Sequence, residues 1–134
     1  TDEPDMIAFM QHPAHVFGSD GLHLPGKTHP RLHGALPRVL ARYVRELGVL
    51  GWEEAIHKMT GGPARRLGLR DRGVLRVGLA ADLCLVDRDE VRDTATFASP
   101  STYPEGIPFV WVNGVAVKAG GQPTGALPGR VLRP

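Results

Sequence analysis

A long run of apolar residues at three- and four-residue spacing dominates the middle of the chain. Its apolar members are Leu32, Leu36, Val39, Leu40, Tyr43, Val44 and Leu47. This spacing places the apolar side chains on one face of a helix and the charged ones on the opposite face. Pro37 is tolerated near the first turn, where its missing N–H costs nothing, and Gly48 supplies a C-terminal stop. The pattern predicts an amphipathic helix over residues 32–47.

Shorter patterns predict helices on both sides of this one. The apolar run Met6–Met10 predicts a short helix or turn. Residues 52–60 carry two glutamates in the first turn and the i,i+4 pair Glu54 and Lys58, which favours a second helix ended by a Gly-Gly pair. A proline then begins a short helix over residues 63–67, which a glycine closes.

The remaining apolar runs predict strands. Ala14–Phe17 predicts a buried strand, and residues 72–78, bracketed by turn-forming glycines, predict a turn-rich strand. Ala81–Val86 is a near-continuous apolar run and predicts a central strand. An Asn-Gly pair lies between two β-prone runs in residues 109–117, which is the strongest short-range signal for a hairpin. The tail from Gly120 is rich in glycine and proline and is expected to form an irregular strap or an edge.

Composition and charge limit the classes of protein that fit. With 134 residues, of which 42% are hydrophobic and 22% charged, the chain is long enough for one modest globular domain. The net charge is only +2, the Lys and Arg residues are scattered, and 6% of residues are aromatic, so we expect no nucleic-acid partner. The sequence contains no apolar segment long enough to span a bilayer and no charged-then-apolar leader, so we expect no membrane association.

The single cysteine indicates the cellular compartment of the protein, and the first residues indicate that the chain is part of a longer one. Cys84 permits no internal disulfide, and its apolar neighbours predict a buried strand thiol in a protein of the reducing cytoplasm. The chain starts with a polar stretch that leads directly into the apolar run Met6–Met10, which is typical of the interior of a sequence. We therefore expect an internal fragment of a longer polypeptide.

Candidate chemistry lies in the Gly-Ser-Asp-Gly sequence at 18–21, directly after the predicted strand Ala14–Phe17. In a parallel α/β barrel the carboxyl ends of the strands form the active face, where a polar side chain faces the pocket. Asp20 is therefore a candidate catalytic residue. Asp and Gly are also ordinary turn residues, so a plain strand-to-loop turn is the alternative. A loop set by glycines and prolines over residues 21–30 is expected to lie over Asp20.

Several short motifs are spread along the chain from about Val16 to Leu132. The more specific ones are Gly18-Ser19-Asp20-Gly21, His29-Pro30-Arg31-Leu32, Pro37-Arg38-Val39-Leu40 and Tyr103-Pro104-Glu105-Gly106-Ile107. The Ala-Asp-Leu strand at 81–83 and the Val-Asn-Gly hairpin at 112–114 are of a kind that amidohydrolases share in general. Together these residues resemble the N-acyl-D-amino-acid deacylases (D-aminoacylases) of the amidohydrolase superfamily.

The resemblance implies a fold and a reaction. The fold is α/β, the C-terminal fragment of a metal-dependent (β/α)8 amidohydrolase barrel followed by strands of the small β-sandwich domain. Residues 1–68 are then the last strand and helices of the barrel, and residues 69–134 are the C-terminal part of the small β-domain. The reaction is zinc-dependent hydrolysis of the amide bond of N-acyl-D-amino acids to a carboxylic acid and a D-amino acid. The zinc ligands are expected upstream of this chain, so we expect the fragment alone to be inactive.

The resemblance also gives roles to two residues. Asp20 matches the aspartate that ends the last barrel strand, takes a proton from metal-bound water and later helps to protonate the leaving amine. Arg31 matches an arginine that binds the free α-carboxylate of the N-acyl amino acid substrate, which a guanidinium meets with two parallel N–H donors. The alternative for Arg31 is a surface arginine that caps the following helix.

Two pairs of histidines have a spacing that suggests metal ligands. They are His12 with His15 and His29 with His33, and neither pair has a third ligand at a convincing distance. We therefore expect no metal held by this chain alone.

The missing part of the barrel predicts a partner for this chain, and two alternative functions remain open. One barrel unit cannot close a barrel, so exposed apolar surface is expected to favour self-association or pairing with the missing N-terminal part. Within enzymes, the alternative is another amidohydrolase, such as a hydantoinase-like or dihydroorotase-like cyclic amide hydrolase. Outside enzymes, the alternative is a non-catalytic β-rich assembly module.

Overall fold

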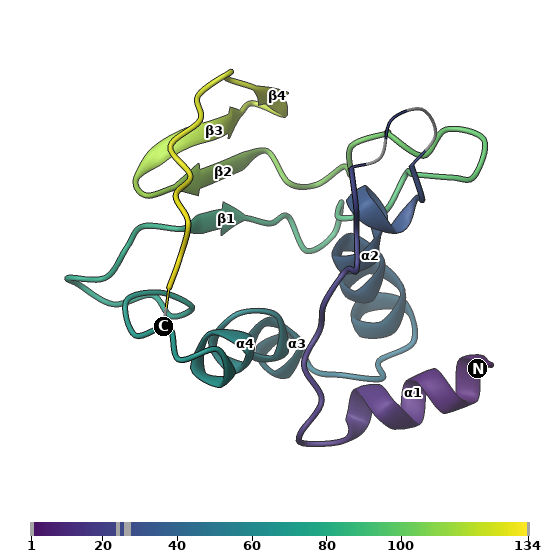
Figure 1. The fold of residues 1–134 in the computed structure, drawn as a ribbon. Coiled ribbons are helices and arrows are strands. Elements are labelled where there is room, and N and C mark those ends of the chain that lie inside the picture. Colours follow the sequence, from purple (N-terminus) through teal and green to yellow (C-terminus); the bar gives the residue numbers. More distant parts are fainter. Residues whose placement is uncertain (1, 24, 26–27, 134) are drawn as a thin grey trace.

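Helices form the first half of the chain and strands the second half (Figure 1). The computed structural model describes residues 2–23, 25 and 28–133. The helices are α1 (Glu3–Gln11), α2 (Arg31–Arg38), η1 (Val39–Glu46), α3 (Trp52–Met59) and α4 (Gly61–Arg66), and the strands are β1 (Leu83–Leu85), β2 (Phe109–Val112), β3 (Val115–Ala119) and β4 (Gln122–Pro123). The change from helix to strand agrees with the sequence, in which the last predicted helix ends at residue 67 and apolar runs typical of strands follow from residue 72. No helix in the described ranges is long and apolar enough to cross a membrane.

Helix α1 is held to the rest of the helical half at its first turn. Asp2 caps the helix, because its Oδ1 accepts a hydrogen bond from the Asp5 N–H at 3.1 Å. The Glu3 carboxylate accepts two hydrogen bonds from Arg42, at 2.8 and 3.1 Å, and one from the Tyr43 hydroxyl at 3.2 Å. The Arg42 guanidinium lowers the pKa of the Glu3 carboxyl. The short helix predicted at Met6–Met10 is therefore confirmed, and it is longer than predicted.

The predicted amphipathic helix is present as α2 and η1, and Pro37 lies deeper in it than predicted. Helix α2 begins at Arg31 with Pro30 as its N-cap, so Pro37 is inside the helix rather than in its first turn. Proline has no N–H to donate to the preceding turn. From Val39 the helix continues as a π-helix, and its end is closed by the Leu47 N–H, which donates to the Arg42 carbonyl at 2.8 Å.

The hydrophobic core lies under η1 and between the helices. Its buried members are Met10, Val39, Leu40, Tyr43, Val44, Leu50, Ala55 and Val91. Val91 comes from the loop between β1 and β2 and is fully buried. Arg45 holds this loop, because its Nη1 donates to the carbonyls of Arg88, Asp89 and Val91 at 2.8 to 3.2 Å. The loop therefore brings the fully buried Val91 into the core of the first half, and the partly buried Val86 and Ile107 pack against the same core.

A Gly-Gly pair follows α3 and begins α4. The break between the two helices falls at Thr60, whose backbone leaves the helical region at φ −128° and ψ −86°. At Gly62 a Cβ would lie 3.0 Å from the His57 carbonyl and 3.2 Å from a methyl group of Val16. The predicted helices over 52–60 and 63–67 are therefore confirmed as α3 and α4, and α3 ends just before the Gly-Gly pair as predicted. The difference from the prediction is that both glycines belong to α4, which they allow to begin in close contact with its neighbours.

The four strands form one antiparallel sheet in the order β1-β2-β3-β4. The predicted hairpin is confirmed. Asn113 and Gly114 connect β2 to β3 with φ angles of 48° and 80°, the left-handed conformations that a two-residue hairpin turn requires. The two-residue strand β4 agrees with the predicted edge in the tail.

The prediction of a buried central strand with a buried cysteine is wrong. Only Leu83–Leu85 of the predicted strand Ala81–Val86 is β-structure, and β1 lies at an edge of the sheet. All three of its residues are exposed, Cys84 included. Apolar neighbours still desolvate the Cys84 thiol and raise its pKa, while Lys118 opposes this effect. The apolar run is typical of a strand with both faces covered, but within the described residues only β2 pairs with it.

Two other predicted strands are not strands in the structure. Residues 72–78 are irregular and consist of bends and one turn, with Gly73 and Gly78 at φ +87° and +89°. Ala14–Phe17 is irregular, and its backbone contact to another element is the Phe17 N–H, which donates to the Lys58 carbonyl at 3.0 Å. A strand needs a neighbouring strand to bond with, and the described part of the chain provides none beside Ala14–Phe17.

We expect Gly106→Ala to destabilise the protein by about 3 kcal/mol or more. A Cβ at position 106 would lie 2.3 Å from the backbone nitrogen of Val91, and φ is +71°. Gly120→Ala is the matched control, because its φ is +55° and no atom lies within 4 Å of the added Cβ. This control carries only the backbone strain, about 1 kcal/mol. Urea unfolding of both variants measures the difference, and equal losses would contradict the close approach at Val91.

Candidate active site

Asp20 lies in a strained backbone conformation outside any hairpin. Its φ is +48°, and the other non-glycine residue in the described ranges with a positive φ is Asn113 in the hairpin turn. The preceding Ser19 hydroxyl accepts a hydrogen bond from the Gly21 N–H at 3.2 Å, which closes the turn. At Gly21 a Cβ would lie 2.8 Å from the Leu32 Cα, so the turn packs directly against the start of α2. Strain of this kind is common at functional sites.

Arg31 contacts Asp20 at two places. The Arg31 Nη2 lies 2.8 Å from the Asp20 Oδ2, and the Arg31 Nε–H donates to the Asp20 main-chain carbonyl at 2.9 Å. The side chains are 43% and 79% exposed, so both remain accessible to a ligand. A guanidinium has five N–H donors, and two of them are used here. The structure thus brings together the two predicted site residues, and among the described residues part of the Arg31 fork has no partner and could bind a second anion.

His29 caps the helix that carries Arg31. Its Nδ1 accepts a hydrogen bond from the Arg31 N–H at 3.1 Å, and its ring meets the ring of Phe97 edge-on at 5.0 Å. The His29 side chain thus satisfies one N–H of the first turn of α2, the Leu32 and His33 N–H groups donate to the His29 and Pro30 carbonyls, and the Arg31 side chain is directed to Asp20 instead of to the helix end. Positions 24, 26 and 27 of the loop predicted to lie over Asp20 are outside the described residues.

A loop from the second half of the chain borders this site. In Figure 1 the green segment before β2 reaches the first turn of α2. A cavity of about 390 Å³ lies between them, and Arg31 and Phe97 are among its lining residues. Arg38 and Asp93 line it as well and form an ion pair at 3.0 Å. Sequence reasoning missed Asp93 and Phe97, because no motif links this loop to the start of α2.

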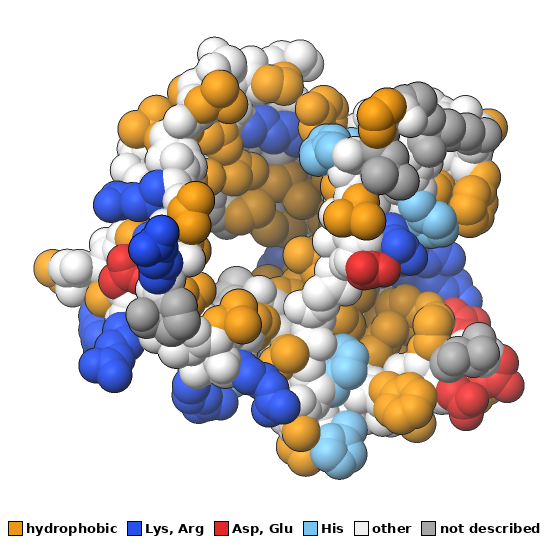
Figure 2. All heavy atoms as spheres, viewed as in Figure 1, with side chains coloured by type: hydrophobic (Ala, Val, Ile, Leu, Met, Phe, Trp, Pro, Cys, Tyr) orange, Lys and Arg blue, Asp and Glu red, His pale blue; other side chains and the backbone are white. Residues whose placement is uncertain are grey.

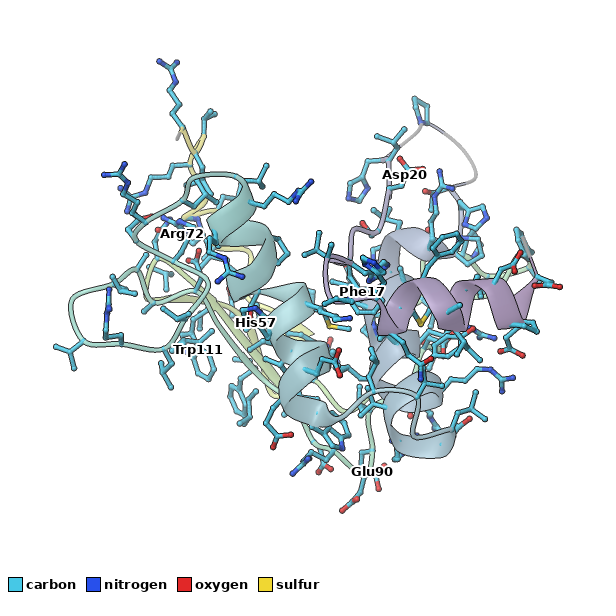
Figure 3. All side chains as sticks on the ribbon, turned by 90° about the horizontal axis from the view of Figure 1, so that it is seen from below. Phe17, Asp20, His57, Arg72, Glu90 and Trp111 are labelled. Carbon is cyan, nitrogen blue, oxygen red and sulfur yellow. The ribbon has the colours of Figure 1, made fainter. Side chains whose placement is uncertain are left out.

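In the segment that precedes Asp20, the side-chain rings of His15 and Phe17 pack against each other. Figure 3 shows Phe17 and, further along the chain, Asp20. The His15 ring meets the Phe17 ring edge-on, with centroids 4.6 Å apart. Desolvation lowers the pKa of His15, and the nearby charge of Lys58 lowers it further. The His15 Nδ1 is buried and has no hydrogen-bond partner among the described residues, so the neutral ring is the form that this packing favours.

The described residues do not form a metal site. Within residues 2–23, 25 and 28–133, no three or more His, Cys, Asp or Glu side chains are grouped so that they can hold a metal ion. The His12 Nδ1 instead accepts a hydrogen bond from the Ala14 N–H at 3.2 Å. His33 packs edge-on against Tyr103 at 5.0 Å. Any metal that acts with Asp20 must therefore have most of its ligands elsewhere.

Comparison with known proteins places the chain in a family. The model of the Amidohydrolase family matches residues 5–118, and the chain belongs to this family. It is 46% identical to an N-acyl-D-aspartate deacylase and 47% identical to an N-acyl-D-glutamate deacylase, both of Alcaligenes xylosoxydans xylosoxydans, over 99% and 98% of its length. A D-aminoacylase of the same organism is 46% identical over 98% of the chain. The chain spans about a quarter of the length of these relatives, 27% in each case.

Solved structures agree with this assignment. A D-aminoacylase studied for its binuclear metal centre matches 100% of the chain with a TM-score of 0.95 and 43% identity, over 28% of its own length. The N-acyl-D-glutamate deacylase of Bordetella bronchiseptica, complexed with zinc and a phosphonate inhibitor, matches 92% of the chain with a TM-score of 0.84 and 43% identity, over 27% of its own length. The chain therefore has the α/β fold of one part of these amidohydrolases.

The lowered pKa of His15 predicts a loss of stability in acid. An unfolded chain binds a proton on histidine near pH 6.5, and the folded chain binds one on His15 only at lower pH. The stabilising effect of neutral His15 is thus complete above about pH 6.5 and is lost as the pH falls toward the lowered pKa. We expect the unfolding free energy of wild type to fall relative to His15→Leu as the pH drops from 8 to 5, measured by urea unfolding. Parallel pH profiles would contradict this account.

Proposed function

We propose that the protein to which this chain belongs hydrolyses the amide bond of N-acyl-D-amino acids, giving a carboxylic acid and a D-amino acid. The observation that carries this proposal is the similarity, at 46 to 47% identity over nearly the whole chain, to three deacylases of this kind. Two of them are named for different acidic amino acids, so the common element is the N-acyl-D-amino acid. We further propose that residues 1–68 complete a (β/α)8 barrel, that residues 69–134 belong to a small β-domain, and that the protein is cytoplasmic.

In this reaction Asp20 is the residue that moves the proton. Zinc, bound by residues outside the described part of this chain, supplies a Lewis acid that makes water a nucleophile near neutral pH. The Asp20 carboxylate accepts the proton of the attacking water through an Oδ atom. A C–O bond forms, the amide C–N bond breaks, and Asp20 returns the proton to the leaving amine. The exposure of the Asp20 carboxylate and its left-handed backbone support this role, since the carboxylate is accessible to a substrate and backbone strain is common at functional sites.

Arg31 has two functions in this proposal. Its Nε and one Nη2 hydrogen hold Asp20, and its remaining donors bind the free α-carboxylate of the substrate. One guanidinium then fixes the distance between the proton-transfer group and the substrate. The cavity beside Arg31, lined by Phe97, Arg38 and Asp93, is adjacent to the substrate carboxylate in this arrangement.

An apolar surface between the sheet and the helices supports a proposal about the partner of this chain. An apolar cavity of about 510 Å³ lies between the sheet and the helices, and Figure 2 shows hydrophobic side chains around this hollow. Leu40, Met59 and Val110 are among its lining residues. The exposed edge strand β1 is continuous with it. We propose that the rest of the longer chain, or a second copy of it, covers this surface.

We expect Asp20→Asn in the full-length protein to lower kcat for N-acetyl-D-amino acids by about 100- to 10,000-fold, because the amide cannot accept the proton. KM should change little, since the substrate carboxylate binds to Arg31. Steady-state kinetics with matched zinc content measure both constants. A variant that keeps wild-type kcat would exclude Asp20 from the chemistry.

We expect Arg31→Gln to raise KM for an N-acetyl-D-amino acid by about 10- to 100-fold, the range for loss of a charge-assisted hydrogen bond. With the α-carboxamide analogue, which carries no carboxylate, KM should be unchanged by the substitution. Arg92→Gln is the control, because Arg92 pairs with Glu105 in the loop before β2. Equal KM effects on both substrates would show that Arg31 does not bind the carboxylate, and would favour a cyclic amide hydrolase.

A further inference from the structure

Lys58 is the one buried charged residue in the described part of the chain. Its side chain is 5% exposed. The Lys58 Nζ donates to the carbonyl of Met10 at 2.5 Å and to the carbonyl of His12 at 2.9 Å, and it lies 3.0 Å from the Glu54 Oε1. An ammonium has three N–H donors, and here each has an oxygen partner. The Lys58 head is thus fully used within the protein and is not available to a ligand.

The two carbonyls belong to the end of α1. Met10 lies in the last turn of this helix, and His12 is its C-cap. The last carbonyls of a helix have no partners within the helix and carry partial negative charge, so a cation there is stabilising. Lys58 therefore fixes the place at which the chain leaves α1 and starts toward Asp20.

The main chain of Lys58 fixes the same segment at a second place. Its carbonyl accepts the hydrogen bond of the Phe17 N–H at 3.0 Å. Asp20 is three residues further on, about 10 Å of extended chain. Between the two contacts, His15 packs on Phe17, and Val16 packs where Gly62 leaves no room for a side chain. One residue of α3 thus holds both ends of the segment that presents Asp20.

We propose that Lys58 is a positioning residue for Asp20. It touches neither Asp20 nor Arg31, and it acts by setting the path of residues 12–17 through three hydrogen bonds from one point on α3. This inference rests on the proposed function, since it assigns the cost of losing Lys58 to the proton transfer at Asp20.

The test uses the full-length zinc-loaded protein with N-acetyl-D-amino acids. We expect Lys58→Met to lower kcat about 10- to 100-fold with KM changed less than about 2-fold, the loss that a displacement of about 1 Å causes. Hydrogen exchange should become faster in a peptide covering residues 12–20. Glu54→Gln is the matched control, because it keeps both carbonyl contacts and removes only a half-exposed carboxylate. We expect it to leave kcat within about 2-fold of wild type.

A double-mutant cycle separates positioning from a general structural role. The kcat values are calculated per folded molecule. If Lys58 acts through Asp20, Lys58→Met lowers kcat in the wild type but does not lower it further in the Asp20→Asn variant. If the two losses multiply, the inference is wrong. If Lys58→Met does not fold, the cycle is measured with Lys58→Arg, whose planar head does not fit the same three partners. An inactive wild type would overturn the proposed function itself, whereas an active wild type with multiplying losses would overturn only the role of Lys58.

Discussion

The buried ammonium of Lys58 is the interaction on which the helical half depends. A cation removed from water costs several kcal/mol unless all of its donors are satisfied, so Lys58 requires its partners in place. Two of them are the carbonyls of Met10 and His12, which fixes the end of α1 against α3. The start of α1 is fixed separately by the contacts of Glu3 with Arg42. Each end of α1 is thus held by a cation from another helix, and its apolar side chain Met10 enters the core between them.

The π-helix η1 connects the helices to the loop between β1 and β2 through hydrogen bonds from its long polar side chains. Its Tyr43 and Arg42 face Glu3 of α1, while Arg45 donates to three carbonyls of the loop that carries Val91. The two halves therefore meet through a few long side chains, the buried Val91 and the partly buried Val86 and Ile107, and not through a continuous sheet. This arrangement explains why a cavity lined by apolar residues stays open between the sheet and the helices. It also explains why Gly106 matters, because it allows the chain to pass directly over Val91.

Local signals predicted the elements that are stabilised locally. The hairpin at Asn113 and Gly114 and the amphipathic helix from 32 to 47 were predictable, because backbone conformation and one buried face decide them. The strand expected at Ala14–Phe17 and the buried Cys84 were wrong, because both depend on which strands lie beside them. The resemblance pointed to Asp20 and Arg31, but it did not predict that their side chains touch. The two residues are eleven positions apart in the sequence, and their spacing does not determine where the Arg31 guanidinium lies. Lys58 was predicted only as an i,i+4 partner of Glu54, and its burial depends on where α1 ends.

The wrong strand predictions and the exposed apolar surfaces have one physical origin, which is that the partners of these segments are missing from the described residues. An extended apolar segment without a ladder, an exposed apolar edge strand and an apolar cavity each leave hydrogen-bonding or hydrophobic capacity unused among the described residues. The relatives are nearly four times as long as this chain, and the matched part of the D-aminoacylase structure is 28% of that chain. We infer that the unused capacity of Ala14–Phe17 and β1 is satisfied by the rest of the polypeptide. On this inference the apolar patterns at Ala14–Phe17 and in β1 reflect burial in the whole protein, although neither segment forms the predicted buried strand within the described residues.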